Sequence, residues 1–83
     1  MTEQEARIIL TMAGCSMNIT DTAKRNYVHR NTVLYHIGKI KEKTGLDARN
    51  FYQLYELTGR AKGTLKQLEK RRGLTARLKE EKP

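Results

Sequence analysis

Proline occurs once in this chain of 83 residues, as the final residue Pro83. Proline lacks an amide hydrogen and clashes with the preceding helical turn, so its absence from the rest of the chain leaves long stretches able to form helices. The sequence also lacks the alternating apolar and polar runs, and the Asn-Gly or Asp-Gly pairs, that indicate strands and hairpins. We therefore predict an all-α fold.

Capping residues and glycines predict where the first two helices begin and end. Thr2 and Glu5 have the spacing of a capping box, in which each side chain accepts a hydrogen bond from the other residue's amide. The first helix is expected to start there, to turn its apolar residues inward and to end at Gly14. Asn18 is placed to cap a short second helix over about 19–26. The expected apolar face of the first helix consists of Ala6, Ile9, Leu10 and Ala13.

Two longer helices are predicted in the rest of the chain. The third covers residues 30–44, and Gly45 stands where a left-handed residue ends a helix. Asp47 is expected to cap a fourth, long helix that reaches residue 72 and stops at Gly73. Its predicted apolar stripe consists of Phe51, Leu54, Tyr55, Thr58, Ala61, Leu65 and Leu68.

The length corresponds to one small domain, which we place at residues 1–73, followed by a basic tail at 74–83 that is expected to fray. A single cysteine, Cys15, excludes an internal disulfide framework. There is no apolar run of about 20 residues, and the acidic start does not resemble a signal peptide. We therefore expect no membrane association and a cytoplasmic location, on the bacterial nucleoid if the chain binds DNA.

The charge of the chain indicates a polyanionic partner. The net charge is +8, and residues 30–83 hold 14 basic and 6 acidic residues, which accounts for all of it. A basic stretch of this kind is the electrostatic signature of a nucleic-acid-binding surface. A chain with no Trp and one Phe can form only a modest core, without an enclosed substrate cavity, so we do not expect an enzyme.

Residues 18–40 have the pattern of a helix-turn-helix, in which one helix braces a second across DNA. Ala23 is small, as needed where two helices cross closely, and Val28 is the apolar residue of the turn. The resulting architecture is a small helix-turn-helix bundle, three short helices plus a long C-terminal helix, with no wing. Apolar residues recur at the spacing of one core-facing stripe on the third helix: Val33, Ile37 and Ile40.

Turning that stripe inward exposes a face suited to DNA. At its N-terminal end, Arg30 can pair with a guanine edge, Asn31 with adenine, and Leu34 can touch a thymine methyl group. The predicted base contacts are His29, Arg30, Asn31 and Leu34. The predicted backbone contacts are Thr32, Tyr35, His36, Gly38, Lys39, Lys41 and Lys43. The helix from about residue 30 would enter the major groove of double-stranded DNA.

The run ITDTAKRNYVHRNTVLYHIGKIKEKTGLD, residues 19–47, resembles the C-terminal DNA-binding domain of PucR-type transcriptional regulators, the purine-catabolism and sugar-diacid regulator group. The shared pieces are Thr22-Ala23, Val28-His29-Arg30-Asn31-Thr32, Tyr35, Lys39-Ile40 and Thr44-Gly45-Leu46. The resemblance implies a sequence-specific DNA-binding regulator of transcription. Asn26 and His36 depart from the family, which usually has Leu and Arg at these positions, so a phosphate contact by residue 36 does not carry over. The family's ligand-sensing region is not matched either, so no small-molecule effector is predicted.

Other interpretations of the sequence involve the fourth helix and the metal-binding residue types. The far part of that helix could pair with a second subunit through Ala61, Leu65 and Leu68, giving a homodimer, or could fold back at Gly63. A helical protein-interaction or assembly module that uses this helix is the alternative function, and structured-RNA binding is a weaker one. The spacing of Cys15, His29 and His36 matches no structural zinc pattern, so neither a metal nor a cofactor is expected.

Overall fold

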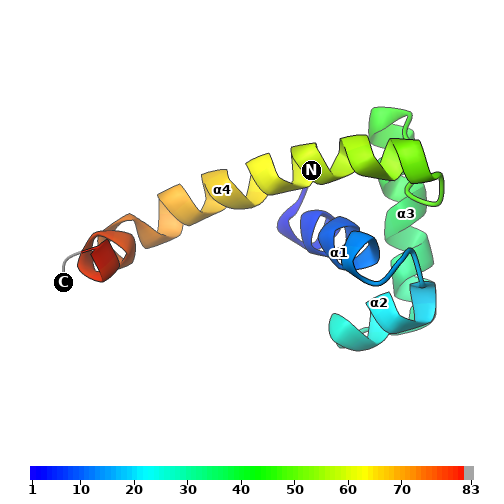
Figure 1. Cartoon of the computed structure of the whole chain (residues 1–83), viewed down its shortest axis with the longest axis horizontal. Coiled ribbons are helices and arrows are strands. Elements are labelled where there is room, and N and C mark those ends of the chain that lie inside the picture. Colours follow the sequence, from blue (N-terminus) through cyan, green and yellow to red (C-terminus); the bar gives the residue numbers. More distant parts are fainter. Residues whose placement is uncertain (82–83) are drawn as a thin grey trace.

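The computed structural model consists of four α-helices in the part of the chain that it describes (Figure 1). They are α1 (Glu3–Gly14), α2 (Ile19–Arg25), α3 (Arg30–Thr44) and α4 (Phe51–Glu81). The structure describes the backbone of residues 1–81 and the side chains of residues 1–71. No strand is present within residues 1–81, and the all-α prediction is confirmed. None of the helices in this range is both long and apolar enough to cross a bilayer.

The caps predicted for the first two helices are present. The Thr2 hydroxyl accepts a hydrogen bond from the Glu5 amide at 3.1 Å, and the Glu5 carboxylate accepts one from the Thr2 amide at 3.0 Å. The Asn18 side chain accepts from the Asp21 amide at 2.9 Å. Each such cap stabilises a helix by about 1 kcal/mol. Local sequence thus fixes where α1 and α2 begin.

The predicted start of α4 is wrong by one turn. Asn50, rather than Asp47, accepts the hydrogen bond from the Gln53 amide at 3.1 Å and caps the helix. Asp47 instead accepts from the Arg49 amide at 2.9 Å and so closes the turn that precedes α4. The Gln53 side chain in turn accepts from the Asp47 amide. Two capping-type residues three positions apart make either start possible, and the choice depends on how the turn leaves α3.

Glycine predicts two helix ends correctly and one incorrectly. Gly45 ends α3 with φ +77°, as expected. α1 ends at Gly14, as predicted, and the left-handed residues that follow it are Ser16 and Met17. The predicted stop at Gly73 is wrong: α4 continues to Glu81, because an interior glycine costs only about 1 kcal/mol and no proline lies within the helix. The division into a domain at 1–73 and a frayed tail at 74–83 stays a prediction.

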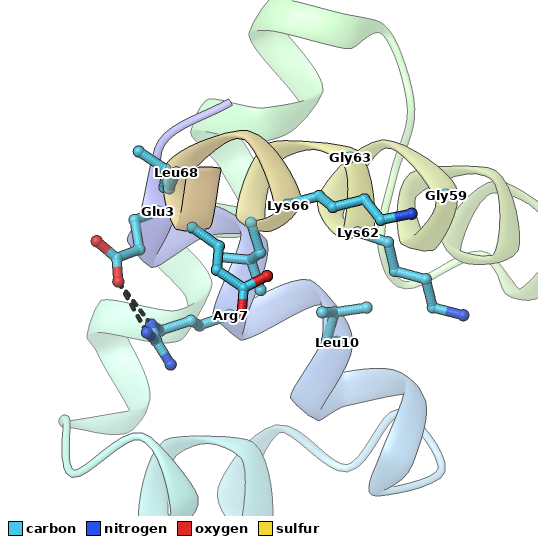
Figure 2. A pocket seen from close by; sticks show the side chains of 10 residues that line it. Glu3, Arg7, Leu10, Gly59, Lys62, Gly63, Lys66 and Leu68 are labelled. Atoms are coloured by element: carbon cyan, nitrogen blue, oxygen red, sulfur yellow. Dashed lines mark hydrogen bonds and ion pairs between the residues drawn. The ribbon is translucent and has the colours of Figure 1, made fainter. Parts of the chain in front are cut away.

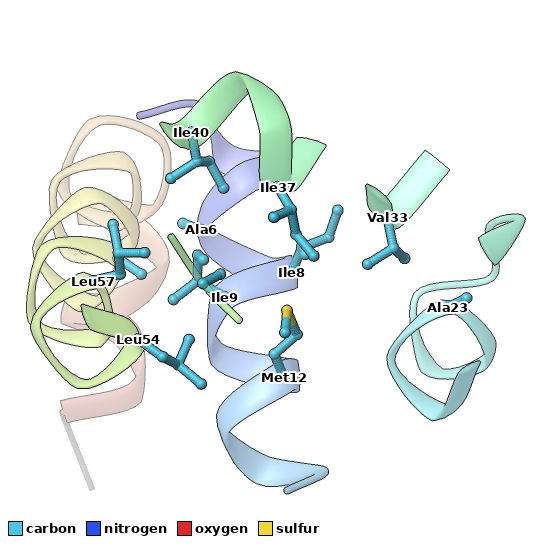
Figure 3. Close-up of a cluster of buried hydrophobic side chains, with 12 residues drawn as sticks. Ala6, Ile8, Ile9, Met12, Ala23, Val33, Ile37, Ile40, Leu54 and Leu57 are labelled. Atoms are coloured by element: carbon cyan, nitrogen blue, oxygen red, sulfur yellow. The ribbon is translucent and has the colours of Figure 1, made fainter. Parts of the chain in front are cut away.

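α1 is the centre of the core. It packs against α4 on one side and against α2 and α3 on the other, as Figure 3 shows. This explains why the predicted inner face of α1 was only half correct: Ile8 and Met12 are fully buried, whereas Ala13 is exposed. A helix with neighbours on two sides buries a wider face than a single amphipathic stripe. The buried apolar residues of α1 are Ala6, Ile8, Ile9 and Met12.

α4 covers α1 with its first half and then extends away from the body of the domain (Figure 1). Leu54, Leu57 and Ala61 are buried against the core. The predicted stripe is wrong near its start, since Phe51 and Tyr55 are 67% and 77% exposed. The helix is therefore rotated relative to the prediction, with Leu57 facing α1. The aromatic side chains at its start remain outside the core.

Candidate nucleic-acid interface

The turn between α2 and α3 is built from local hydrogen bonds. The Val28 amide donates to the Ala23 carbonyl at 3.0 Å and the Tyr27 amide to the Lys24 carbonyl at 3.1 Å. This pair of bonds is a Schellman motif, which places Tyr27 in the left-handed region with φ +57°. Val28 is half-buried against the core and Ala23 is buried. The motif reverses the chain within a few residues and so sets where α3 begins.

His29 caps α3 with its imidazole. Its Nδ1 atom accepts a hydrogen bond from the Asn31 amide at 3.0 Å. A neutral imidazole that accepts at Nδ1 has its proton on Nε2, so His29 keeps a donor for an acceptor outside the protein. The cap therefore fixes the direction of the ring as well as the start of the helix. The sequence pattern placed His29 at the helix tip but did not predict this capping role.

The burial pattern of α3 agrees with the predicted orientation. Val33, Ile37 and Ile40 are buried in the core. The residues on the opposite face are exposed: Asn31, Tyr35, Gly38 and Glu42. A Cβ added at Gly38 would meet no atom within 4 Å, so the fold does not require glycine there. The absence of a side chain at Gly38 leaves the helix backbone open to close approach from outside.

The N-terminal end of α3 presents three adjacent exposed residues, His29, Arg30 and Asn31, with Leu34 half-buried beside them. Within residues 1–71, Arg30 forms no ion pair. Its guanidinium is therefore available to an outside acceptor without first breaking an internal contact. We call His29, Arg30 and Asn31 the tip of α3.

The three lysines of α3 are in a different situation, because each has an acidic neighbour. Lys39 Nζ lies 3.8 Å from a carboxylate oxygen of Glu42, and Lys41 Nζ lies 3.7 Å from one of Asp47. Lys43 Nζ lies 2.9 Å from Glu5. The sequence predicts all three as phosphate contacts, but in the structure their positive charges are already partly compensated within the chain.

The Lys43–Glu5 pair joins α3 to α1. Only 4% of the Glu5 side chain is exposed, compared with 50% of the Lys43 side chain. Burial by itself raises the pKa of Glu5, but the hydrogen bond from the Thr2 amide and the Lys43 ammonium outweigh it, so the pKa lies below its ordinary value. The carboxylate thus holds the start of α1 and the end of α3 at once. Its partner lies 38 positions away in the sequence, and no local signal would have revealed it.

Asp47 forms a second charged cluster just after α3. The hydrogen bond from the Arg49 amide lowers the pKa of Asp47, and the nearby Arg49 and Lys41 charges lower it further against an opposing effect of burial. Arg49 Nε lies 3.6 Å from the same carboxylate. The C-terminal end of α3 is therefore surrounded by internally paired charges.

The remaining predicted backbone contacts lie where α3 passes the start of α1. A shallow groove there is lined on the α3 side by Tyr35, His36, Lys39 and Lys43. Its other side is formed by the N-cap Thr2 and the first turn of α1. The His36 ring packs edge-on against Tyr35 with centroids 5.3 Å apart, and its Nδ1 is buried without a protein hydrogen-bond partner among the residues described. Lys39 Nζ lies 5.7 Å from the Tyr35 ring centroid. Thr32 is half-buried on the same flank.

Of the predicted dimerisation residues, Leu68 lies along the seam between α1 and α4 (Figure 2). Ala61 is fully buried within its own chain, so it is not at the surface. Leu65 and Leu68 are half-buried and line a groove together with Leu10 of α1. Figure 2 shows the Arg7–Glu3 ion pair, 2.8 Å long, beside this groove. Over residues 1–71, no cluster of three or more His, Cys, Asp or Glu side chains could hold a metal ion.

The sequence that forms these helices matches the model of a known protein family. The sequence model of the PucR C-terminal helix-turn-helix domain matches residues 6–59. The match spans most of α1, all of α2 and α3, and the beginning of α4. Neither a curated protein nor a solved structure matches the chain at a significant level.

Proposed function

The chain belongs to the family of PucR C-terminal helix-turn-helix domains, and on this premise we propose that it is a sequence-specific regulator of transcription that binds double-stranded DNA. In this proposal α3 enters the major groove with its N-terminal end leading. One observation carries the proposal: the exposed tip His29, Arg30 and Asn31 begins the helix whose opposite face is buried in the core.

The tip has the chemistry needed to distinguish base pairs. Arg30 can donate two hydrogen bonds to O6 and N7 of guanine, and Asn31 can pair with N6 and N7 of adenine. The Nε2 atom of His29 remains a donor because Nδ1 is occupied by the Asn31 amide. Leu34, half-exposed one turn later, can contact a thymine methyl group. We therefore assign base contacts to these four residues.

Backbone contacts are assigned to the rest of the exposed surface of α3. Tyr35 and Lys39 can reach phosphates, Gly38 permits close approach of the backbone, and Thr32 and His36 lie on the flank. A phosphate could replace Glu42 or Asp47 as the partner of Lys39 or Lys41, since both of those ion pairs exceed 3.5 Å. Lys43 is held more closely, by a buried carboxylate. We propose that Lys43 acts on DNA mainly by holding α3 in place.

We also propose that the regulator binds DNA as a homodimer. A single recognition helix reads only a few base pairs, and two-fold symmetric sites are the usual solution. α4 extends beyond the body of the domain, and Leu65 and Leu68 lie half-buried along its groove with α1. Leu68→Glu should lower the mass observed by sedimentation. The control is Gln67→Glu, which introduces the same charge at an exposed position on another face of the same helix; an unchanged mass for Leu68→Glu would contradict a dimer through this face.

The test of DNA reading is the selection of bound duplexes from a random pool. We expect enrichment of a palindrome whose half-sites are about 34 Å apart if the protein is a dimer. On the selected duplex, Arg30→Ala should reduce binding by about 1–3 kcal/mol and leave binding to unrelated duplexes nearly intact. Arg60→Ala on α4 is the matched control. Absence of any enriched sequence would contradict sequence-specific binding.

One observation favours a second candidate function, assembly of copies of this chain through the start of α4. Phe51, Tyr52 and Tyr55 are 67%, 81% and 77% exposed at the start of this helix. Aromatic side chains are enriched at protein interfaces. If Tyr52→Ala together with Tyr55→Ala leaves the duplex selection unchanged but abolishes self-association, the aromatic surface serves assembly; if it abolishes neither, this second candidate is wrong.

A further inference from the structure

We propose that the turn between α2 and α3 contains a second phosphate-binding site, formed by Lys24, Arg25 and Tyr27, which we call the turn patch. The ligand is a phosphodiester of the DNA strand that borders the groove occupied by α3. The inference rests on the proposed DNA binding and extends it to residues for which the sequence predicts no DNA contact.

The first observation is that the charge of the turn patch is not compensated. Lys24 and Arg25 are exposed in the last turn of α2 and form no ion pair within the described side chains. The three lysines of α3, in contrast, each have a carboxylate within 4 Å. Cations near a helix C-terminus are favoured by the helix dipole alone. The dipole explains why two cations end α2, but it does not explain Tyr27, which follows them.

The second observation is the conformation and exposure of Tyr27. Its φ is +57°, a region that residues with a Cβ rarely adopt and that glycine adopts most easily at this position of a Schellman motif. The side chain is nevertheless 96% exposed, so packing does not compensate for the backbone cost. A large aromatic side chain that is almost fully exposed on a strained backbone indicates a use outside the molecule.

The third observation is the position of the patch relative to the tip of α3. Tyr27 precedes Arg30 by three residues, which limits their Cα separation to about 11 Å. The major groove is about 12 Å wide, so a residue this close to a base-reading arginine lies within reach of the bordering strand. The phenol hydroxyl can donate a hydrogen bond to a phosphate oxygen, and the two cations can neutralise the same stretch of backbone.

The decisive variant is Tyr27→Gly, because it should raise the stability of the fold while it weakens DNA binding. Removing the Cβ relieves the backbone, so urea unfolding should occur at an equal or higher midpoint. Loss of the phenol should weaken binding about threefold to tenfold, both on the duplex selected from a random pool and on an unrelated duplex. Ser16→Gly is the matched control, since Ser16 has the same left-handed conformation, φ +54°, after α1. It should match the stability change and leave DNA affinity unaltered.

The two cations are tested by the salt dependence of binding. Lys24→Gln with Arg25→Gln should reduce the slope of log K against log salt concentration by about 2, since each phosphate contact contributes about 0.9. Lys62→Gln with Lys66→Gln removes the same charge from exposed positions on α4 and should leave the slope within about 0.5 of the wild-type value.

The outcomes separate this inference from the proposed function. If the wild-type protein binds no duplex, the proposed function itself is wrong. If the wild type binds and Tyr27→Gly and the Lys24/Arg25 variant bind equally well, only the turn patch is wrong, and its exposed aromatic surface would then face a protein partner. A loss confined to the selected duplex would also overturn the proposal, because a phosphate contact weakens binding to all sequences alike.

Discussion

The two ends of α3 differ in how their charges are used. At the N-terminal end, Arg30 is exposed and forms no ion pair within residues 1–71. At the C-terminal end, Lys43 is held at 2.9 Å by a carboxylate that is almost completely buried. Both residues count equally in the net charge of +8. Only the first is available to a polyanion at no internal cost.

This difference indicates that the two ends of α3 have different roles: the last turn stabilises the fold, and the first turn is free for the proposed contact with DNA. The last turn of α3 is attached to α1 through Glu5, and Glu5 also completes the capping box of α1. A rigid attachment at one end holds the other end at a fixed position relative to the core. Variants at Glu5, Lys43 and Glu42 test this difference between the two ends.

Glu5→Ala should lower the free energy of unfolding by about 2–3 kcal/mol, because it removes both the capping box and the hydrogen bond from Lys43. Chemical denaturation monitored by circular dichroism measures this. Glu56→Ala, which removes an exposed i,i+4 pair with Arg60, should cost no more than about 0.5 kcal/mol. Equal losses in the two variants would mean that the capping box and the Lys43 hydrogen bond of Glu5 stabilise the fold no more than an exposed ion pair does.

Lys43→Met should lower the stability of the fold without changing the salt dependence of DNA binding. The variant keeps an apolar stem but leaves the Glu5 carboxylate without its ion-pair partner, so the free energy of unfolding should fall by about 1–2 kcal/mol. The salt dependence of DNA binding should stay within about 0.5 of the wild-type slope, because Lys43 is not expected to contact phosphate. A slope reduced by about 0.9 with unchanged stability would assign Lys43 to the DNA backbone instead.

Acid should weaken the attachment of α3 to α1. The folded-state pKa of Glu5 is lowered, so the stability that its carboxylate contributes is present above about pH 4.5 and is lost as the pH falls through the folded-state pKa. Asp47 acts in the same direction at lower pH. The difference in unfolding free energy between the wild type and Glu5→Gln should therefore shrink below about pH 4.5. A constant difference from pH 7 to pH 3 would contradict the assignment.

Glu42→Gln should change DNA binding only slightly, and it should strengthen the binding. Glu42 is exposed on the face of α3 assigned to DNA and lies 3.8 Å from Lys39. Removing its negative charge frees Lys39 and reduces repulsion of phosphate, so binding to any duplex should strengthen by about 0.5 kcal/mol. Glu56→Gln, on α4, is the control and should change binding less. Weaker binding by Glu42→Gln would place this face away from DNA.

Much of the architecture follows from local sequence because caps and turns are satisfied within a few residues. The Thr2 and Asn18 caps, Gly45 as the end of α3, and the buried face Val33, Ile37 and Ile40 were all predictable. The exposure of the Arg30–Asn31 tip followed from the same helical spacing. These features depend on hydrogen bonds and periodicities that span fewer than ten residues, and the same residues support the family resemblance.

Contacts between distant segments decided the rest. The wide buried face of α1 and the rotation of α4 that buries Leu57 depend on which helices pack together, which no single stripe specifies. The pairing of Lys43 with Glu5 depends on the crossing of α3 and α1. The number of basic residues was known from the sequence, but their availability was not, because an ion pair depends on distance in space. The folded chain therefore determines which of its positive charges can bind an external polyanion.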